Sequence, residues 1–206
     1  MYRLYGKPFT MSMVPQAVLD DIGAPYELIT LTQAGVVTDP DYLKLRPDGL
    51  VPTLVDGDLV IYEGSAIAMH LADKHAEARL APPLGTPDRA RYYQWMIYLG
   101  SMVHPAVALE YHPDWFAKSD GAIAEVKVRA QQRCDELWSQ IESQVGDGPW
   151  LLGQDFSAAD ILFWLQAQFH YDAKRMLSEN KKVNALVERV SARPKIAALM
   201  RQHGLA

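Results

Sequence analysis

The sequence has almost no cysteine and no concentrated basic segment. Cys134 is the single cysteine among 206 residues, so an internal disulfide, a Cys-x-x-Cys redox pair and a thiolate metal cluster are excluded. The 20 basic residues are outnumbered by 25 acidic ones and never form a run longer than two. Because phosphate binding needs a concentrated basic face, we expect no nucleic-acid partner.

Long apolar segments and metal-ligand patterns are missing as well. No stretch of about 18 consecutive apolar residues is present, which is the length that a membrane-spanning helix requires. The first residues do not resemble a targeting signal. The 6 histidines show no metal-ligand spacing. We therefore expect a cytoplasmic protein with no membrane partner and no metal ion.

The first part of the chain alternates between strand and helix patterns. Segments rich in strand-forming residues are 2–6, 25–31, 52–55 and 59–62. A helix that ends at Gly23 separates the first two segments, and Asp56-Gly57 is a hairpin signal between the last two. A short helix is expected between Pro40 and Pro47, and a further helix from about Ser65 to His75. This order of elements resembles the thioredoxin-like α/β layout.

A proline-rich segment separates this part from a helical one. Three prolines and one glycine fall between residues 76 and 91, which is typical of a linker. Beyond it, apolar residues recur mostly at helical spacing. We therefore expect an α/β domain over residues 1–77, a linker over 78–87 and an all-helical domain over 88–206.

Two helices of the second part carry distinct signals. The helix that contains His104-Pro105 should kink there, because a proline inside a helix removes a hydrogen bond and clashes with the preceding turn. The helix around residues 161–165 is apolar on all sides, so it should be central and buried. Ser157 and Asp160 form a capping-box pattern at its start, which predicts a structural role for Asp160.

Three motifs occur together in an order that one known family shares. They are LVPTLVDGDLVIYEGSAIAMHLADKH at 50–75, LLGQDFSAADI at 151–161 and SARPKI at 191–196. Over nearly its whole length the chain resembles the cytosolic glutathione transferases, and it is nearest in pattern to their bacterial beta type. The resemblance implies a thioredoxin-like glutathione-binding domain followed by an all-α domain, glutathione as the co-substrate, and a homodimer.

The resemblance assigns the glutathione site to two short segments. In the family the Val-Pro bond is cis; a turn at Pro52 would leave the N–H and C=O of Val51 unpaired, and the extended cysteinyl unit of glutathione could bond to both. The alternative is a merely structural bend at a sheet edge. Glu63 can meet the γ-glutamyl ammonium, while backbone N–H groups at Gly64 and Ser65 favour its carboxylate. Gly64 stands where many members have serine, and Ser65 can instead be a simple helix cap.

The group that activates the thiol is less defined. Lys7-Pro8 aligns with the beta-type pattern, which places the catalytic cysteine of that type at Met11. The hydroxyl groups that remain are those of Ser12, Thr10 and Tyr5. Ser12 would ordinarily cap the following helix, but Pro15 has no N–H to donate, so its hydroxyl is more available to a ligand. We predict Ser12 or Thr10 as the activating residue, with Tyr5 and a weak site without a dominant hydroxyl as alternatives.

A second-substrate pocket is predicted from the helical part. The beta type has a histidine nine positions after a tryptophan, near the sulfur and the second substrate, and Trp95 and His104 reproduce this spacing. With Tyr98 and Met102, His104 is expected to line a pocket for a small apolar electrophile. A histidine that is merely tolerated at a proline kink is the alternative.

The predicted function is transfer of the glutathione thiolate to that electrophile. One alternative is a non-catalytic binding or scaffold protein that keeps the fold, because the cysteine is lost. Another is a glutathione-dependent isomerase, dehalogenase or peroxidase. The residue for the glycyl carboxylate stays open among nearby polar side chains, namely Gln33, Thr38, Lys44 and Arg46.

Overall fold

The computed structural model describes residues 1–33 and 35–205. Their contacts divide the chain into two compact units: Met1–Ala81 together with the segment that begins at Ala192, and Pro82–Ser191. The domain boundaries expected from the sequence remain a prediction. The structure adds that the last described helix groups with the α/β unit instead of the helical one.

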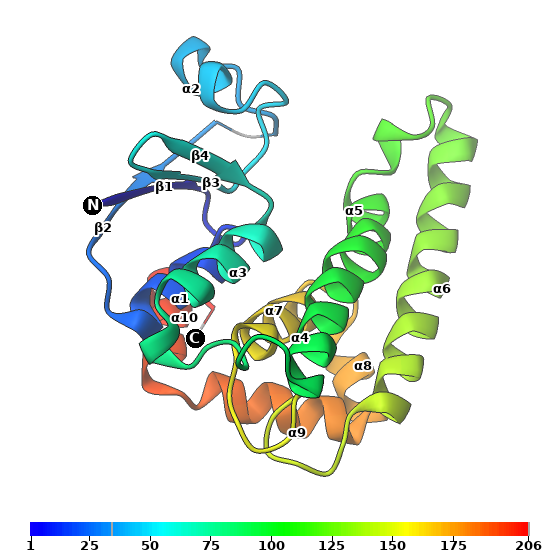
Figure 1. Ribbon diagram of the computed structural model, residues 1–206. Helices are drawn as coiled ribbons and strands as arrows, with labels where there is room; N and C mark the ends of the chain where they lie inside the picture. Colours follow the sequence, from blue (N-terminus) through cyan, green and yellow to red (C-terminus); the bar gives the residue numbers. More distant parts are fainter. Residues whose placement is uncertain (34, 206) are drawn as a thin grey trace. The chain divides into compact units, whose positions relative to one another are not determined.

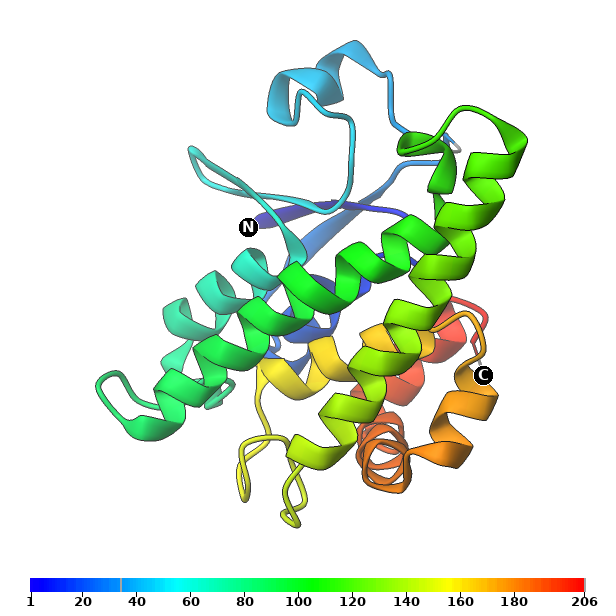
Figure 2. The ribbon, with the colours of Figure 1, turned by 90° about the vertical axis from the view of Figure 1, so that its right-hand side faces the viewer.

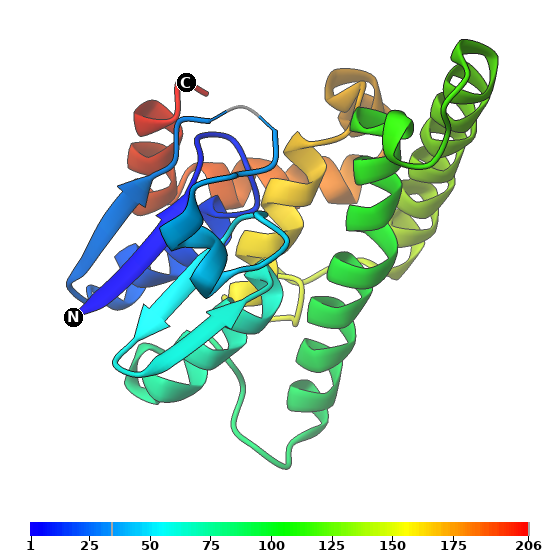
Figure 3. The same ribbon diagram turned by 90° about the horizontal axis from the view of Figure 1, so that it is seen from above.

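The first unit is built on a four-stranded mixed sheet. Its strands are β1 (Tyr2–Gly6), β2 (Tyr26–Thr30), β3 (Thr53–Asp56) and β4 (Leu59–Tyr62), in the order β2-β1-β3-β4. β1 pairs with β2 in parallel, and the other two pairings are antiparallel; Figure 3 shows the strands side by side. The expected thioredoxin-like α/β layout is confirmed.

The helices of the first unit lie on both faces of this sheet. They are α1 (Met13–Ile22), α2 (Pro40–Leu45), α3 (Gly64–Lys74), the short 3-10 helix η1 (Ala76–Ala78) and α10 (Pro194–Gln202). α1 and α3 pack together on one face, and α2 lies on the other (Figure 1). α10 packs against α1, so it reaches the turn between β1 and α1.

Local sequence explains why these elements begin and end where they do. Along β1 the buried residues Tyr2, Leu4 and Gly6 alternate with more exposed ones, as a strand with one buried face requires. α1 ends at Gly23, whose φ of 71° is easily adopted by glycine. Gly57, with a φ of 62°, closes the β3–β4 hairpin. The predicted helix end and hairpin are both confirmed.

The second unit is helical. Its elements are α4 (Pro87–Tyr98), the π-helical segment η2 (Leu99–Val103), α5 (His104–Tyr111), the 3-10 helix η3 (Pro113–Trp115), α6 (Asp120–Gln144), α7 (Ala158–Gln168), α8 (Ala173–Glu179) and α9 (Lys181–Ser191). α4, η2 and α5 form one helical run (Figure 2). The kink at His104-Pro105 stays a prediction, and a π-helical segment directly precedes this pair. The wider turn leaves room for the proline ring, which in a regular α-helix clashes with the preceding turn.

α7 is the buried centre of the second unit. All of its residues except Gln168 are buried. At its start Asp160 accepts hydrogen bonds from the N–H groups of Leu151 at 2.7 Å and Ser157 at 2.8 Å. Burial raises the pKa of Asp160 to about 6, although these hydrogen bonds act in the opposite direction. The predicted capping box is present. None of the helices in the described parts of the chain is long and apolar enough to span a membrane.

Candidate active site

Val51 presents unbonded backbone groups beside the sheet. The Val51-Pro52 peptide is cis, Pro52 is buried and Val51 is half-buried. Among the described residues, no hydrogen bond joins the N–H or C=O of Val51 to another residue. The Pro52 carbonyl, in contrast, accepts a hydrogen bond from Arg46 Nη1 at 2.9 Å. Val51 can therefore bond to an extended peptide in the way that an added strand would.

The N-terminus of α3 forms the second half of this site. Glu63 is the N-cap residue and has a φ of 72°, an uncommon backbone conformation for a residue with a side chain. Gly64 and Ser65 are the first two helical residues, so their N–H groups have no acceptor within the helix. The Glu63 side chain is 67% exposed. The cap is thus Glu63, which corrects the alternative interpretation of Ser65 as a simple N-cap.

Arg46 joins the two halves of the site. Its guanidinium is buried, with 4% of the side chain exposed, and its Nη2 lies 3.2 Å from Glu63 Oε1. It also donates to the Pro52 carbonyl and, from Nε, to Asp48 Oδ1 at 2.7 Å. Burial alone would raise the pKa of Asp48, but its hydrogen bonds with Arg46 and the Leu50 N–H hold it below the usual value. Arg46 therefore fixes Glu63 relative to the Val51-Pro52 peptide.

Two hydroxyl groups meet in the turn between β1 and α1. The Oγ atoms of Thr10 and Ser12 lie 2.6 Å apart. Each can donate to the Lys7 carbonyl, at 2.8 Å from Thr10 and 2.9 Å from Ser12. Ser12 Oγ also accepts from the Lys7 N–H at 3.0 Å. As expected from Pro15, Ser12 makes no side-chain cap hydrogen bond with α1, but its hydroxyl is occupied within the turn.

The two hydroxyl groups of this cluster can donate their hydrogens in more than one arrangement. Two hydrogens serve three short oxygen–oxygen contacts, those of Thr10 with Lys7, Ser12 with Lys7 and Thr10 with Ser12. One hydroxyl can therefore turn toward a ligand while the other keeps the Lys7 carbonyl satisfied. Since hydrogen bonds to charged acceptors are stronger than neutral ones, a thiolate would compete well for that hydrogen. Ser12 is 3% exposed and Thr10 is half-buried, so Thr10 is the more accessible donor.

The positions next to Ser12 are tightly packed. A Cβ atom added to Gly6 would lie 2.6 Å from Ser12 Cβ and 2.7 Å from Ser12 Oγ. Across the turn, a Cβ added to Gly64 would lie 3.2 Å from the Met11 carbonyl oxygen. Met11, which aligns with the beta-type cysteine, thus lies against the start of α3. The turn with the hydroxyl groups and the helix start are brought together in the first unit.

Tyr5 lies on a different part of β1. Its ring packs against that of Tyr42 in α2, with the centroids 5.5 Å apart. Tyr42 in turn hydrogen-bonds to Thr53 Oγ1 at 2.9 Å and to the Leu50 carbonyl. Tyr5 is therefore not part of the hydroxyl cluster that contains Thr10 and Ser12.

The residues predicted for the second substrate lie along one stretch of the second unit. Tyr98 ends α4, Met102 is in the π-helical segment and His104 begins α5. Met102 is exposed, at 42%, whereas Tyr98 and His104 are half-buried. The Tyr98 ring packs edge-on against Trp95, with centroids 6.1 Å apart. A role for these residues in substrate binding remains a prediction.

The last predictions concern a metal site and the contact for the glycyl carboxylate. In the described residues, no group of three or more histidine, cysteine or acidic side chains is arranged to hold a metal ion. Thr38 donates its backbone N–H to Gln33 Oε1 at 3.0 Å, and the exposed Lys44 pairs with Asp41 at 2.6 Å. The contact for a glycyl carboxylate stays open among Gln33, Thr38, Lys44 and Arg46.

Comparison with known proteins decides the family. The model of the glutathione S-transferase N-terminal domain matches residues 1–73, and that of the C-terminal domain matches residues 107–203. A solved glutathione transferase from Methylococcus capsulatus is 30% identical, with 100% of both chains covered and a TM-score of 0.80. The chain belongs to the glutathione S-transferase family. The resemblance to this family and the expected two-part fold are confirmed.

Two further solved structures place the chain among bacterial members of the glutathione S-transferase family. A glutathione transferase homologue from Sulfitobacter, solved with bound glutathione, is 25% identical with a TM-score of 0.87 and covers 100% of this chain and 99% of its own. A beta-class glutathione S-transferase from Sphingomonas chungbukensis is 27% identical with a TM-score of 0.85, covering 99% of this chain and 100% of its own.

Within this glutathione S-transferase, Arg46 is the site residue whose role sequence reasoning missed. The sequence offers it only as one candidate contact for the glycyl carboxylate, yet the structure buries it between Asp48, Pro52 and Glu63. The signal available in the sequence was an arginine followed by the turn pattern Pro-Asp-Gly. That pattern predicts a turn, but it does not show that the arginine points inward to Glu63.

Proposed function

We propose that this chain is a glutathione transferase that conjugates the glutathione thiolate to an apolar electrophile. The observation that carries the proposal is the pair of unbonded backbone groups on Val51 beside the open N-terminus of α3 at Gly64 and Ser65. A tripeptide with a carboxylate at one end matches both features. The relative from Sulfitobacter was solved with glutathione bound, which supports the choice of this peptide.

In this proposal the cysteinyl unit of glutathione bonds to the N–H and C=O of Val51, next to Pro52. The γ-glutamyl carboxylate accepts from the N–H groups of Gly64 and Ser65, where the partial positive charge of the helix N-terminus adds to the attraction. Glu63 binds the ammonium group through Oε2, because its Oε1 lies 3.2 Å from Arg46. Arg46 thereby selects the orientation in which Glu63 meets the ligand.

The hydroxyl cluster of the β1–α1 turn supplies thiol activation. A free thiol has a pKa of about 8.5, and lowering it by about two units corresponds to about 2.7 kcal/mol. One hydrogen bond from a hydroxyl to the thiolate contributes about 1.5–3 kcal/mol, and a helix N-terminus about 0.3–1 kcal/mol. Either Ser12 or Thr10 can give this bond while the other satisfies the Lys7 carbonyl. The thiolate then attacks the electrophilic carbon, and the leaving group departs with its electron pair.

The proposed partners are an apolar electrophile and a second copy of the chain. Tyr98, Met102 and His104 are proposed to contact the apolar electrophile, supported by their exposed and half-buried surfaces and by the beta-type spacing of Trp95 and His104. A homodimer and a cytoplasmic location are proposed from the family resemblance. Exposed apolar side chains on β4, such as Leu59 at 46%, are compatible with burial against a second copy.

A second candidate function is non-catalytic glutathione binding. It is favoured by one observation, namely that the Ser12 hydroxyl is buried and bonded within its own turn, and by the methionine at the place of the beta-type cysteine. Thiol chemistry of another kind, such as glutathione-dependent isomerisation, dehalogenation or peroxide reduction, would use the same ligand site. The transferase and the non-catalytic binding protein differ in whether the thiol of bound glutathione is ionised at neutral pH.

Binding and transfer can be tested separately. Calorimetric titration with glutathione should give saturable binding that Glu63→Gln weakens by about tenfold, or about 1.4 kcal/mol, because the charged contact to the ammonium is lost. Glu125→Gln, an exposed glutamate on α6, is the matched control and should bind like wild type. Conjugation of glutathione to a chloronitrobenzene, followed by product absorbance, then tests transfer. Absence of binding rejects the whole proposal, whereas binding without transfer favours the second candidate.

A further inference from the structure

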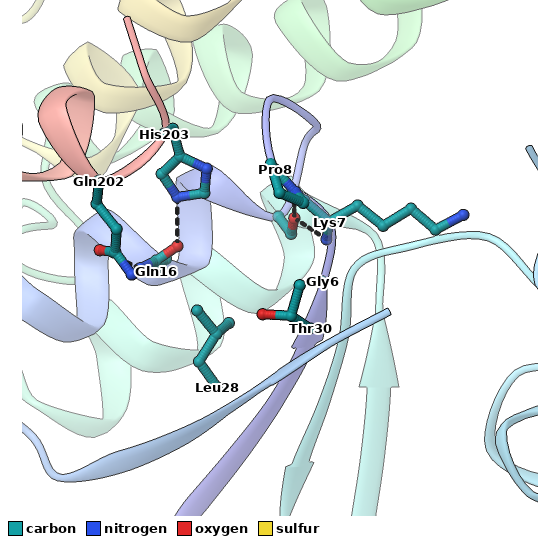
Figure 4. A pocket seen from close by; sticks show the side chains of 9 residues that line it. Gly6, Lys7, Pro8, Gln16, Leu28, Thr30, Gln202 and His203 are labelled. Atoms are coloured by element: carbon teal, nitrogen blue, oxygen red, sulfur yellow. Dashed lines mark hydrogen bonds between the residues drawn. The ribbon is translucent and has the colours of Figure 1, made fainter. Parts of the chain in front are cut away.

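His203 connects α10 to the turn that carries the hydroxyl groups. It follows α10 directly, and its Nδ1 accepts a hydrogen bond from the Phe9 N–H at 3.4 Å. Its Nε2 lies 2.9 Å from Gln16 Oε1, and Gln16 Nε2 donates to Gln202 Oε1 at 3.1 Å. Figure 4 shows the contact between His203 and Gln16. The chain of contacts therefore runs from the β1–α1 turn through α1 to the end of α10.

The direction of each hydrogen bond follows from the Phe9 N–H. A backbone N–H can only donate, so Nδ1 of His203 must carry a lone pair. In the neutral ring the hydrogen is then on Nε2, which donates to Gln16 Oε1, and the amide group of Gln16 is left to donate to Gln202. This one tautomer satisfies all three hydrogen bonds that link Phe9, His203, Gln16 and Gln202. A protonated ring would place an N–H at Nδ1, directly facing the N–H of Phe9.

The turn at this point adopts a backbone conformation that needs support. Phe9 has a φ of 50°, a left-handed conformation that residues with a side chain adopt only when their surroundings impose it. Phe9 directly precedes Thr10, and the same turn continues to Ser12. A shift of the Phe9 peptide would therefore displace the hydroxyl cluster.

His203 and Ser12 also share a cavity. The cavity has a volume of about 120 Å³, and its walls include Lys7, Ser12, Gln16 and His203. Val51, Glu63 and Ser65 are not among the lining residues, so the cavity is separate from the backbone groups proposed to bind glutathione. His203 thus contacts the turn from a side that those groups do not cover.

Burial, and not a neighbouring charge, favours the neutral ring of His203. Burial lowers the pKa of His203, and the carboxylate of Asp20 on α1 only partly offsets this. From the turn, Lys7 lines the same cavity, but in Figure 4 its side chain points away from His203. The residues of β2 that face the cavity, Leu28 and Thr30, are uncharged. Near neutral pH the ring therefore has the lone pair that the Phe9 N–H requires.

We propose that His203 is a positioning residue for thiol activation: its neutral ring holds the Phe9 peptide and thereby the Thr10–Ser12 hydroxyl cluster in place. The role in activation rests on the proposed function, whereas the effect on the turn does not. Protonation of the ring should release the turn, so the position of the hydroxyl groups depends on pH.

Two substitutions separate the two ring nitrogens. His203→Asn retains an acceptor near the position of Nδ1, and His203→Gln retains a polar group near Nε2 but none near Nδ1. Amide hydrogen exchange of residues 7–13 should therefore be close to wild type in His203→Asn and faster by about tenfold in His203→Gln, a factor that corresponds to about 1.4 kcal/mol. His112→Asn, at an exposed histidine of the second unit, is the matched control and should leave this exchange unchanged.

Two further measurements connect the turn to pH and to the thiol. The NMR shift of the Phe9 amide should follow the titration of the His203 ring in wild type and become independent of pH near 6 in His203→Asn. The pKa of bound glutathione should rise more in His203→Gln than in His203→Asn. Exchange in His203→Gln equal to wild type overturns the proposal. A normal thiol pKa in the wild-type complex instead rejects thiol activation itself, and the exchange result still decides whether His203 supports the turn.

Discussion

Replacement of Arg46 tests whether this residue holds the two halves of the proposed glutathione site in position. Arg46→Met retains a long side chain with an apolar stem but removes the donors to Pro52, Asp48 and Glu63. Arg46→Lys keeps the positive charge, but a single ammonium group cannot reproduce the planar fork that contacts all three acceptors. The two variants therefore separate the charge of the residue from its geometry.

The expected loss of stability can be worked out from burial. The bond from Arg46 to the Pro52 carbonyl is buried, and leaving such an acceptor unpaired costs about 1–3 kcal/mol. The carboxylates of Asp48 and Glu63 are 51% and 67% exposed, so water screens them and each pair adds at most about 1 kcal/mol. Arg46→Met should therefore lower the free energy of unfolding by about 1–5 kcal/mol, of which the Pro52 carbonyl accounts for about 1–3 kcal/mol.

The effect on glutathione should be larger on KM than on kcat. Without Arg46, Glu63 is no longer held with one oxygen turned away from the ligand, and loss of one oriented charged contact raises KM by about tenfold. The hydroxyl cluster at Thr10 and Ser12 does not contact Arg46, so kcat should change little. Arg46→Lys should show the same KM defect with a smaller loss of stability.

Initial rates against glutathione concentration and urea unfolding measure these quantities. Arg129→Met, at an exposed arginine on α6, is the matched control and should change neither. An unchanged KM in both Arg46 variants would refute the role assigned to Arg46, as would a fall in kcat with KM unaffected.

Three other outcomes follow from the described contacts. Gly6→Ala should cost about 1–3 kcal/mol in urea unfolding and lower kcat, because its Cβ would lie 2.7 Å from Ser12 Oγ; an unchanged kcat would argue against Ser12. Asp160→Ala should lower the free energy of unfolding by at least about 2 kcal/mol, since two buried N–H groups lose their acceptor, yet leave the glutathione KM of the folded enzyme unchanged. The pKa of His203 is lowered from 6.5 in the folded chain, so the unfolded chain binds more protons near pH 6. The contribution of His203 to the free energy of unfolding is therefore present above pH 6.5 and declines as the pH falls toward the folded pKa. His203→Asn should remove that part of the pH dependence, which unfolding at several pH values would show.

Local signals in the sequence predicted much of the fold and pointed to one half of the candidate site. Gly23 and Asp56-Gly57 mark a helix end and a hairpin through backbone preferences that act within a few residues, and both lie where they were expected. The capping box at Asp160 is equally local. Pro52 and Glu63 could be found because they belong to a motif that is continuous in the chain.

The contacts that join distant segments could not be predicted in the same way. Arg46 meets Glu63 across 17 positions, and His203 meets Phe9 across 194. No periodicity or turn preference specifies such pairs, since they depend on how the packed elements bring side chains together. The same holds for Ser12: its missing cap bond followed from Pro15, but its bonds to Lys7 depend on the path of the turn.

The pKa of the thiol of bound glutathione is the most direct test of the central claim. It can be measured from thiolate absorbance as a function of pH in wild type, in Ser12→Ala, in Thr10→Ala and in the double variant. In wild type we predict a pKa about two units below the solution value of about 8.5. We expect this pKa to rise in at least one single variant and to return to the solution value in the double variant. A wild-type value near that of free glutathione, or a lowered value that survives loss of both hydroxyl groups, would contradict it.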